Sequence, residues 1–408
     1  MAFREQQTAF TYPTVAPSPR YAPPRAPVVA KARRPVPEPN LRKIQMAHPD
    51  INKQDVEAVS KVVASGCLSL GPMVTAFEHA VADYVGVQHA VAVSSGTAAL
   101  HLIVKAMGLG PRDEVLVPSF TFASSVNALL YEGAKPVFVE VDPATFNMDL
   151  NDLEHRITHH TRAIMAVDLF GVPVDWDRLN AFADRHGLLV IDDCCEALGA
   201  EYKGRRLGSF GHAGAFAFYP NKQITAGEGG MIVTNDADLA ALVRSYSNQG
   251  RGAMGGWLQY DRMGYNYRMN EMSAALGLSQ MGRIEAILTK RERVARLYDE
   301  RLAGMANVIV PGPVADGRKS WFVYIVTLAE GYDRDLTIEG MIAEGVPARG
   351  YFPPLHTQPY IQELFGDLTG TLPVTEALAK RTLALPFHNN LTVVEIDHVL
   401  AVLERNLR

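Results

Sequence analysis

The sequence predicts an α/β protein whose large domain is built on a mostly parallel sheet. From about residue 50, short apolar runs alternate with stretches of helical periodicity, and most of these runs are continuous. Continuous apolar strands are buried on both faces, as in a parallel sheet that helices cover on each side. With 408 residues, 48% of them hydrophobic, the chain also has the length and apolar content for two domains.

The helices and strands of this sheet are expected in a regular order along the chain. Helical patterns, in which apolar residues recur at intervals of three and four, are predicted at residues 55–64, 73–84, 98–107 and 176–186. Seven strands are predicted from the apolar runs at residues 89–94, 114–120, 136–141, 163–170, 188–191, 213–219 and 231–234.

The chain continues beyond this sheet in both directions. Residues 270–302 have a helical and increasingly charged pattern, and a strand at 321–328 and a last helix at 394–407 follow. Nine of the 25 prolines lie in the first 40 residues, which predicts a disordered tail. We therefore expect a Pro/Arg-rich tail, a large α/β domain and a smaller C-terminal α+β domain, at residues 1–43, 44–285 and 286–408.

Charge and cysteine content exclude several classes of protein. The net charge is −5, and because residues 1–44 carry eight basic and two acidic side chains, the rest of the chain carries −11. An acidic body argues against nucleic acid as a partner. No apolar run is long enough to span a bilayer, and none of the three cysteine pairs has zinc-ligand spacing. We expect a cytoplasmic protein without a metal site.

Lys222 lies between an apolar, aromatic strand and a glycine-rich turn. Partial burial disfavours the ammonium form of a lysine and lowers its pKa, and a neutral amine is what Schiff-base chemistry requires. Lys222 is thus a candidate to bind the aldehyde of pyridoxal phosphate. From this segment alone, an ordinary lysine at the end of a strand is an equally good interpretation.

Two further candidates follow earlier strands, where ligands bind in open α/β sheets. Gly96 and Thr97 occupy a small-residue turn before a helix, a combination that suits a phosphate group. An ordinary helix N-cap would have the same sequence. Phe122 follows the next strand and is placed to stack on a planar ring, although core packing is the commoner role of phenylalanine.

Acidic and basic candidates complete the pattern. Asp192 and Asp193 end an apolar strand, where a desolvated carboxylate needs a cation such as a protonated pyridine nitrogen. We choose Asp193 for this role and expect a structural one for Asp192, although a helix N-cap after a strand would have the same sequence. A catalytic dyad of the two acids is disfavoured, because adjacent strand residues point to opposite faces. Asn266 and Arg268 lie in a donor-rich segment before a helix, which fits either a phosphate contact or a polar loop.

Taken in order, the phosphate turn, the aromatic residue, the aspartate and a lysine 29 residues later supply the contacts that pyridoxal phosphate requires. The chain resembles the DegT/DnrJ/EryC1/StrS family of PLP-dependent sugar aminotransferases, which have the fold type I architecture. The resemblance runs from about residue 44 to the C-terminus. It rests on FYPNK at 218–222, TAGEGG at 225–230, SGTAAL at 95–100, PSFTF at 118–122 and GYNYRM at 264–269, with LSLGP at 68–72 and FPPLH at 352–356.

This resemblance implies a role for each candidate. It implies that Lys222 forms the internal Schiff base, that Asp193 contacts the pyridine nitrogen and that Phe122 stacks on the ring. Gly96 and Thr97 are implied to bind the phosphate.

Asn266 and Arg268 match positions that reach the cofactor of a neighbouring subunit, so a homodimer with shared sites is implied. Two positions depart from the family pattern. Ala217 stands where a phosphate-binding serine is common. Glu196 stands where glutamine or histidine is common, and its carboxylate is expected near the cofactor.

The expected function is amino-group transfer, with L-glutamate as donor and a nucleotide-linked keto-sugar as acceptor, in a ping-pong mechanism through PLP and PMP. An aminotransferase for a cyclitol or amino-shikimate-type ketone would have the same cofactor site, and a non-catalytic PLP-binding regulator is a third alternative. The intact Lys222 argues against the dehydratases among the relatives. Substrate contacts are expected near His48 and from Tyr351 and His356.

Overall fold

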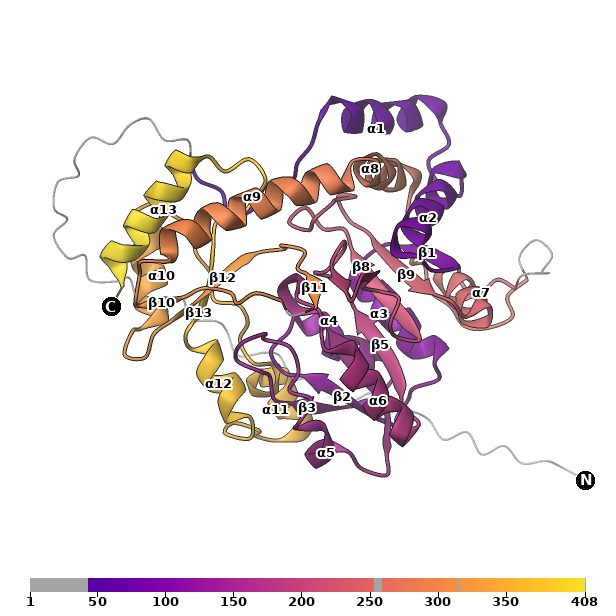
Figure 1. Cartoon of the computed structure of the whole chain (residues 1–408). Helices are drawn as coiled ribbons and strands as arrows, with labels where there is room; N and C mark the ends of the chain where they lie inside the picture. The colour runs from indigo at the N-terminus through magenta and orange to yellow at the C-terminus, as the bar shows by residue number, and fades with distance from the viewer. Residues whose placement is uncertain (1–42, 253–258, 315, 408) are drawn as a thin grey trace, which may run out of the picture. The chain divides into compact units, whose positions relative to one another are not determined.

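The computed structural model describes residues 43–252, 259–314 and 316–407. Its main feature is a seven-stranded sheet with the order β1-β9-β8-β5-β4-β2-β3 (Figure 1). The strands are β1 His89–Val93, β2 Glu114–Pro118, β3 Lys135–Val139, β4 Thr161–Val167, β5 Leu189–Asp193, β8 Ala213–Ala217 and β9 Gly230–Thr234. Strand β9 is antiparallel to both of its neighbours, whereas the pairs from β8 to β3 are parallel. The predicted mostly parallel sheet is confirmed.

Two hydrophobic cores cover the two faces of this sheet. In β2, Leu116 belongs to one core while Val115 and Val117 belong to the other, because successive side chains of a strand point to opposite faces. On the Leu116 side the covering helices are α2 Pro72–Val85, α6 Trp176–His186 and α8 Glu271–Met281. On the other side they are α3 Gly96–Ala106, α4 Ala123–Tyr131 and α7 Ala237–Ser247.

A long helix, α9 Ile284–Leu302, joins the sheet to the C-terminal part of the chain. It runs from α8 towards α10 and α13, as Figure 1 shows. Ile287 and Leu288 belong to the core on one face of the large sheet, and Val294 and Tyr298 belong to a separate C-terminal core. The division predicted near residue 285 remains a prediction, because α9 contributes to both cores.

The C-terminal core surrounds a three-stranded sheet of order β10-β12-β13, formed by β10 Val308–Ile309, β12 Tyr324–Leu328 and β13 Thr382–Leu385. Helices α10 Arg334–Ala343 and α13 Val393–Asn406 cover it. The shorter elements are α5 Leu153–Arg156, η1 Leu169–Gly171, β6 Glu201–Tyr202, β7 Arg205–Arg206, β11 Gly317–Arg318, η2 Leu355–Thr357, α11 Pro359–Phe365 and α12 Pro373–Ala379.

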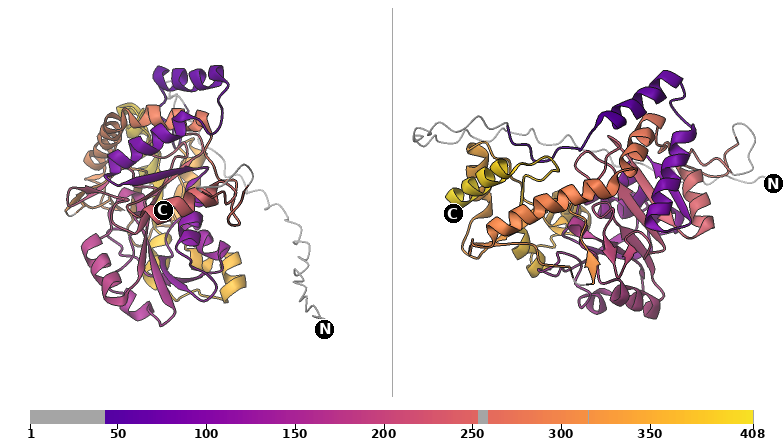
Figure 2. Two further views of the ribbon diagram at one scale, coloured as in Figure 1. Left: turned by 90° about the vertical axis from the view of Figure 1, so that its right-hand side faces the viewer. Right: turned by 45° about the horizontal axis from the view of Figure 1, so that its top comes forward.

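Helix α1 Lys53–Ser65 stands apart from the large sheet, at the margin of both views in Figure 2. A capping box formed by Asn52 and Asp55 starts the helix, and the Asp55 carboxylate also binds Ser279 and Arg283 near α8. In the described residues no helix has the length and apolar character needed to cross a membrane. The tail predicted for residues 1–43 lies outside the described residues except for Lys43.

Candidate active site

The candidate active site is a cavity of about 510 Å³ at the carboxyl ends of the parallel strands. Gly96 and Thr97 follow β1, Phe122 follows β2, Asp193 ends β5 and Lys222 follows β8, and all five line this cavity. Because parallel strands end at the same edge of a sheet, residues that are far apart in sequence meet there. The C-terminal part of the chain closes the cavity with Phe322, Arg349, Tyr351 and Phe352.

One end of the cavity is suited to a phosphate group. Helix α3 begins there with unpaired N–H groups, as any helix does, and Ser95 caps it by accepting a hydrogen bond from the Ala98 N–H at 3.1 Å. The hydroxyls of Thr97 and Ser124 lie 2.7 Å apart beside this helix start. A Cβ on Gly230 would lie only 2.3 Å from the Ser95 carbonyl oxygen, so the glycine allows β9 to pass against the turn.

The departure at Ala217 also lies here, since this residue lines the cavity without a hydroxyl. The Ser124 hydroxyl is a donor at the same end of the cavity, and we propose that it supplies the missing phosphate contact.

Asp193 is a buried carboxylate that faces the cavity and is 4% exposed. Its Oδ2 accepts a hydrogen bond from the Ser125 hydroxyl at 2.6 Å, and its Oδ1 accepts one from the Cys195 N–H at 3.2 Å. These two donors fix the carboxylate without supplying a positive charge. A buried carboxylate with one side open to a cavity is suited to a cationic ligand group, such as a pyridinium N–H.

Asp192 is buried on the other side of β5, as the alternation of strand side chains requires. Its Oδ2 accepts a hydrogen bond from the Gly208 N–H at 2.8 Å, and the Cys194 thiol donates to its Oδ1. Asp168 lies in the same buried group, where burial and the charge of Asp192 raise its pKa well above the usual range. These contacts agree with the structural role predicted for Asp192.

Lys222 has 13% of its side chain exposed and lies between two groups. Its Nζ is 3.6 Å from Glu196 Oε1 and 3.9 Å from the centre of the Phe322 ring. Burial raises the pKa of Glu196, while the charge of Lys222 opposes this shift. The other Glu196 oxygen accepts a hydrogen bond from the Phe170 N–H at 3.0 Å. The carboxylate expected near the cofactor therefore contacts the lysine.

The donor groups of the cavity fit pyridoxal phosphate. A helix start with two hydroxyls is suited to the phosphate, the Asp193 carboxylate to the ring nitrogen, and the Lys222 amine to the aldehyde. Phe122 lines the same cavity and is 61% exposed, so its ring is available for stacking. The individual roles of these residues remain predictions.

Asn266 and Arg268 do not line this cavity. The Arg268 guanidinium donates hydrogen bonds to the Asn248 side chain at 2.9 Å and to the Gln249 side chain at 2.6 Å. The backbone of Asn266 pairs with that of Asn248. Their predicted contact with a neighbouring subunit's cofactor remains a proposal.

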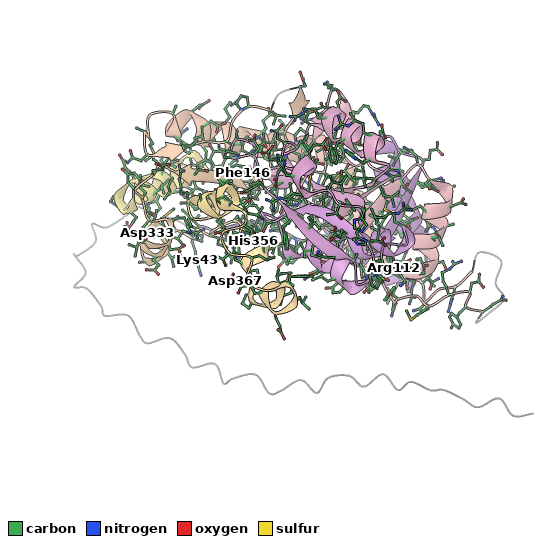
Figure 3. The ribbon with its side chains drawn as sticks, turned by 90° about the horizontal axis from the view of Figure 1, so that it is seen from below. Lys43, Arg112, Phe146, Asp333, His356 and Asp367 are labelled. Carbon is green, nitrogen blue, oxygen red and sulfur yellow. The ribbon has the colours of Figure 1, made fainter. Side chains whose placement is uncertain are left out.

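The structure corrects the expectation for His356, whereas Tyr351 does line the cavity. His356 is fully buried and lies within the body of the protein (Figure 3). Its Nδ1 is 2.6 Å from the Ser119 hydroxyl and its Nε2 is 3.0 Å from the Glu376 carboxylate. With both ring nitrogens bound to protein groups, His356 joins the end of β2 to α12 and has no access to a substrate.

Sequence reasoning missed several residues that line the cavity. Ser124 and Ser125 come directly after Phe122, so their position after a strand end could have indicated them. Phe322 and Arg349 come from the C-terminal part, where no local signal marks them. Tyr219 and Glu228 flank Lys222 in sequence and also line the cavity.

The fold and the cavity define a fold type I enzyme that uses pyridoxal phosphate. A sequence profile of the DegT/DnrJ/EryC1/StrS aminotransferase family matches residues 49–404, and the chain belongs to this family. The protein is therefore a PLP-dependent aminotransferase.

Three known proteins illustrate the similarity. GDP-perosamine synthase of Caulobacter vibrioides is 42% identical over 372 residues, which are 90% of this chain and 99% of that protein. PseC of Helicobacter pylori, an aminotransferase of pseudoaminic acid biosynthesis, has a TM-score of 0.85 at 28% identity, covering 90% of this chain and 99% of PseC. Spr1654 of Streptococcus pneumoniae, in its PLP form, has a TM-score of 0.84 at 27% identity, covering 90% of this chain and all of that one.

Proposed function

We propose that the enzyme transfers an amino group from L-glutamate to the keto group of a nucleotide-linked sugar. The observation that carries this proposal is the convergence of Gly96, Thr97, Asp193 and Lys222 on one cavity. The relatives support a sugar acceptor, since GDP-perosamine synthase matches over 99% of its length and PseC acts in pseudoaminic acid biosynthesis.

When bound, pyridoxal phosphate supplies an aldehyde that condenses with amines and a ring that withdraws electrons from the carbon bearing the amine. Lys222 holds the resting cofactor and is released when the amino donor takes its place. With the cofactor bound, the free Lys222 amine would remove a proton from the α-carbon of the donor and return it to the carbon that was the aldehyde carbon, two bonds away. Asp193 keeps the ring nitrogen protonated, which preserves the electron-withdrawing property of the ring.

Glu196 and Phe322 orient Lys222 for this proton transfer. The carboxylate oxygen lies 3.6 Å and the ring centre 3.9 Å from the Lys222 Nζ, so these two contacts hold the amine in place. Both groups are buried, so water is kept from one side of the amine.

Among the described lining residues, one cation besides the proposed cofactor lysine is suited to an anionic group of a substrate. Arg349 is exposed, and it and Lys222 are the cations among the described lining residues. The carboxylates of glutamate and the phosphates of a sugar nucleotide each need such a charge. The cavity volume falls within the range of roughly 300–1,000 Å³ that is usual for ligand sites.

The acceptor is tested with L-glutamate labelled with ¹⁵N at its amino group. The purified enzyme is incubated with nucleotide-linked keto-sugars and, in parallel, with cyclitol ketones, and the products are examined by mass spectrometry. We expect the label in an amino sugar nucleotide. Label found only in an amino cyclitol would contradict the proposed acceptor.

We also propose that two chains form a dimer in which each cavity is completed by Asn266 and Arg268 of the other chain. These residues lie outside the cavity of their own chain, and large apolar side chains are exposed nearby in the sequence, Met263 among them at 76%. In the N-terminal part, Leu70 is 68% exposed in a segment that matches the family pattern.

Mixing two inactive variants tests the shared site. Arg268→Ala and Lys222→Ala chains, allowed to exchange subunits, form mixed dimers with one intact cavity, so activity returns to at most about a quarter of wild type. The control is a chain carrying both substitutions, which gives no such recovery when mixed with Lys222→Ala. Absence of any recovery in the first mixture would contradict shared sites.

A further inference from the structure

Arg291 on α9 is a buried cation that lies beside the segment carrying Lys222. It is 3% exposed, and burial lowers its pKa to about 10, so it stays charged at neutral pH. Among the described residues its hydrogen-bond partners are three backbone carbonyls and one side-chain amide, and no carboxylate. A guanidinium in such surroundings is placed to hold backbone segments together.

These carbonyls belong to two segments that both contact or adjoin the lysine, one at residue 221 and one at residues 321–322. Arg291 Nε donates to the Trp321 carbonyl at 2.5 Å, and Nη2 donates to the Phe322 carbonyl at 2.8 Å. Nη2 also donates to the Asn221 carbonyl at 3.3 Å, directly before Lys222. One side chain thus fixes the peptide next to the lysine and the peptide of the ring that the lysine contacts.

A neutral side chain makes a second connection between the same segments. Gln223, directly after Lys222, donates through Nε2 to the Glu196 carbonyl at 2.6 Å and to the Ser320 carbonyl at 3.2 Å. Residues 221–223 and 320–322 are therefore tied together on both sides of Lys222. The Lys222 amine, which lies between these two connections in sequence, contacts the Phe322 ring and the Glu196 carboxylate.

We propose that Arg291 is a positioning residue that holds Lys222 at the place where its amine reaches the cofactor. The proposal rests on the proposed role of Lys222. In the step concerned, the Lys222 nitrogen forms a bond to the aldehyde carbon of pyridoxal phosphate, and one water molecule leaves. A displacement of about 1 Å between reacting groups can cost roughly 100-fold in rate, so a loosened Asn221 peptide slows this step.

The opposing interpretation is that Arg291 only stabilises the fold. The two are separated by comparing two ligands of the apoenzyme. Pyridoxal phosphate needs the phosphate end, Asp193 and a bond to Lys222, whereas PMP has an amine in place of the aldehyde and cannot form that bond. A general loss of structure weakens the binding of both pyridoxal phosphate and PMP. A displaced lysine slows only the formation of the covalent bond to pyridoxal phosphate.

The experiment uses Arg291→Gln and Arg291→Lys in the full chain. The rate of covalent attachment is followed by absorption after mixing with pyridoxal phosphate, and borohydride reduction with peptide mass analysis identifies the modified lysine. We expect attachment to slow by roughly 10- to 100-fold in Arg291→Gln and by less in Arg291→Lys, with PMP affinity within about threefold of wild type.

Arg293→Gln is the matched control. Arg293 is also on α9 and donates to the carbonyls of Asn389 at 3.4 Å and Leu391 at 3.2 Å, but not to the lysine segment. This variant is expected to attach pyridoxal phosphate at the wild-type rate.

An unchanged attachment rate in Arg291→Gln, or an equal loss of PMP affinity, would overturn the proposal. If Arg291→Gln does not fold, Arg291→Lys decides in the same way, because it keeps the charge and loses the forked geometry. Modification of a lysine other than Lys222 in wild type would refute the proposed role of Lys222 itself, and this result is distinguishable from a failure of the Arg291 proposal.

Discussion

Replacing Asp193 by asparagine removes the negative charge that faces the cavity and changes the side-chain volume very little. Asp193 is 4% exposed, and its oxygens accept hydrogen bonds from Ser125 at 2.6 Å and Cys195 at 3.2 Å. An asparagine retains one carbonyl oxygen for one of these donors. We therefore expect Asp193→Asn to fold and to lose the pairing of the carboxylate with the ring nitrogen.

The expected loss of rate follows from the burial of Asp193 and of the ring nitrogen with which it would pair. Removing one partner of a buried ion pair costs about 3–5 kcal/mol. At 1.36 kcal/mol for each factor of ten, a loss of this size in the transition state lowers the rate by roughly 10²- to 10⁴-fold. The assay is the single-turnover rate of the L-glutamate half-reaction, measured by the change in cofactor absorption, together with the melting temperature.

Asp192→Asn is the matched control, because Asp192 is the adjacent residue, is equally buried and binds Gly208 away from the cavity. This substitution is expected to alter stability, because it disturbs a buried hydrogen-bond network, and to leave the half-reaction within about threefold of wild type, because Asp192 does not line the cavity. A fully active Asp193→Asn enzyme, or an equal loss of rate in the two variants, would refute the assigned role of Asp193.

Three further variants test other residues of the site and of the fold. Lys222→Ala is expected to abolish turnover while PMP still binds, and turnover at the wild-type rate would exclude Lys222 as the cofactor-binding lysine. Thr97→Val combined with Ser124→Ala is expected to weaken PMP binding by about 1–3 kcal/mol in equilibrium dialysis, because two phosphate donors are lost; unchanged affinity would place the phosphate elsewhere. Burial and the neighbouring positive charges lower the pKa of His388 to about 4, so the unfolded chain binds its proton first as the pH falls. The free energy of unfolding should therefore decrease by up to about 3 kcal/mol between pH 7 and pH 4, and His388→Gln should flatten this part of the profile in thermal melts; an equally steep profile in the variant would assign the dependence to other groups.

The seven strands of the large sheet could be predicted from sequence because each is a continuous apolar run. The predicted helix at 176–186 has the bounds of α6, and the predicted segment at 270–302 forms α8 and α9. The candidate residues Gly96, Asp193 and Lys222 could be located for a related reason. Each lies at the end of a strand or shortly after it, and the topology of a parallel sheet brings such positions to one edge.

The residues that sequence reasoning missed act through contacts between distant segments. Phe322 reaches Lys222 across 100 positions of the chain, and Arg291 binds Asn221 across 70. No local pattern marks such pairs. The same limit explains the error at His356. Its sequence neighbours suggest a loop near the substrate, but in the structure its Nδ1 is bonded to the hydroxyl of Ser119, 237 positions away.

The central claim is that Lys222 holds pyridoxal phosphate and that L-glutamate displaces it. The most direct measurement is the visible absorption spectrum of the purified protein with pyridoxal phosphate, before and after L-glutamate is added. We expect a band from the cofactor bound to the lysine, and a shift of this band to the shorter wavelength of PMP on addition of glutamate. A protein that never develops the first band, or keeps it unchanged with glutamate, would contradict the account.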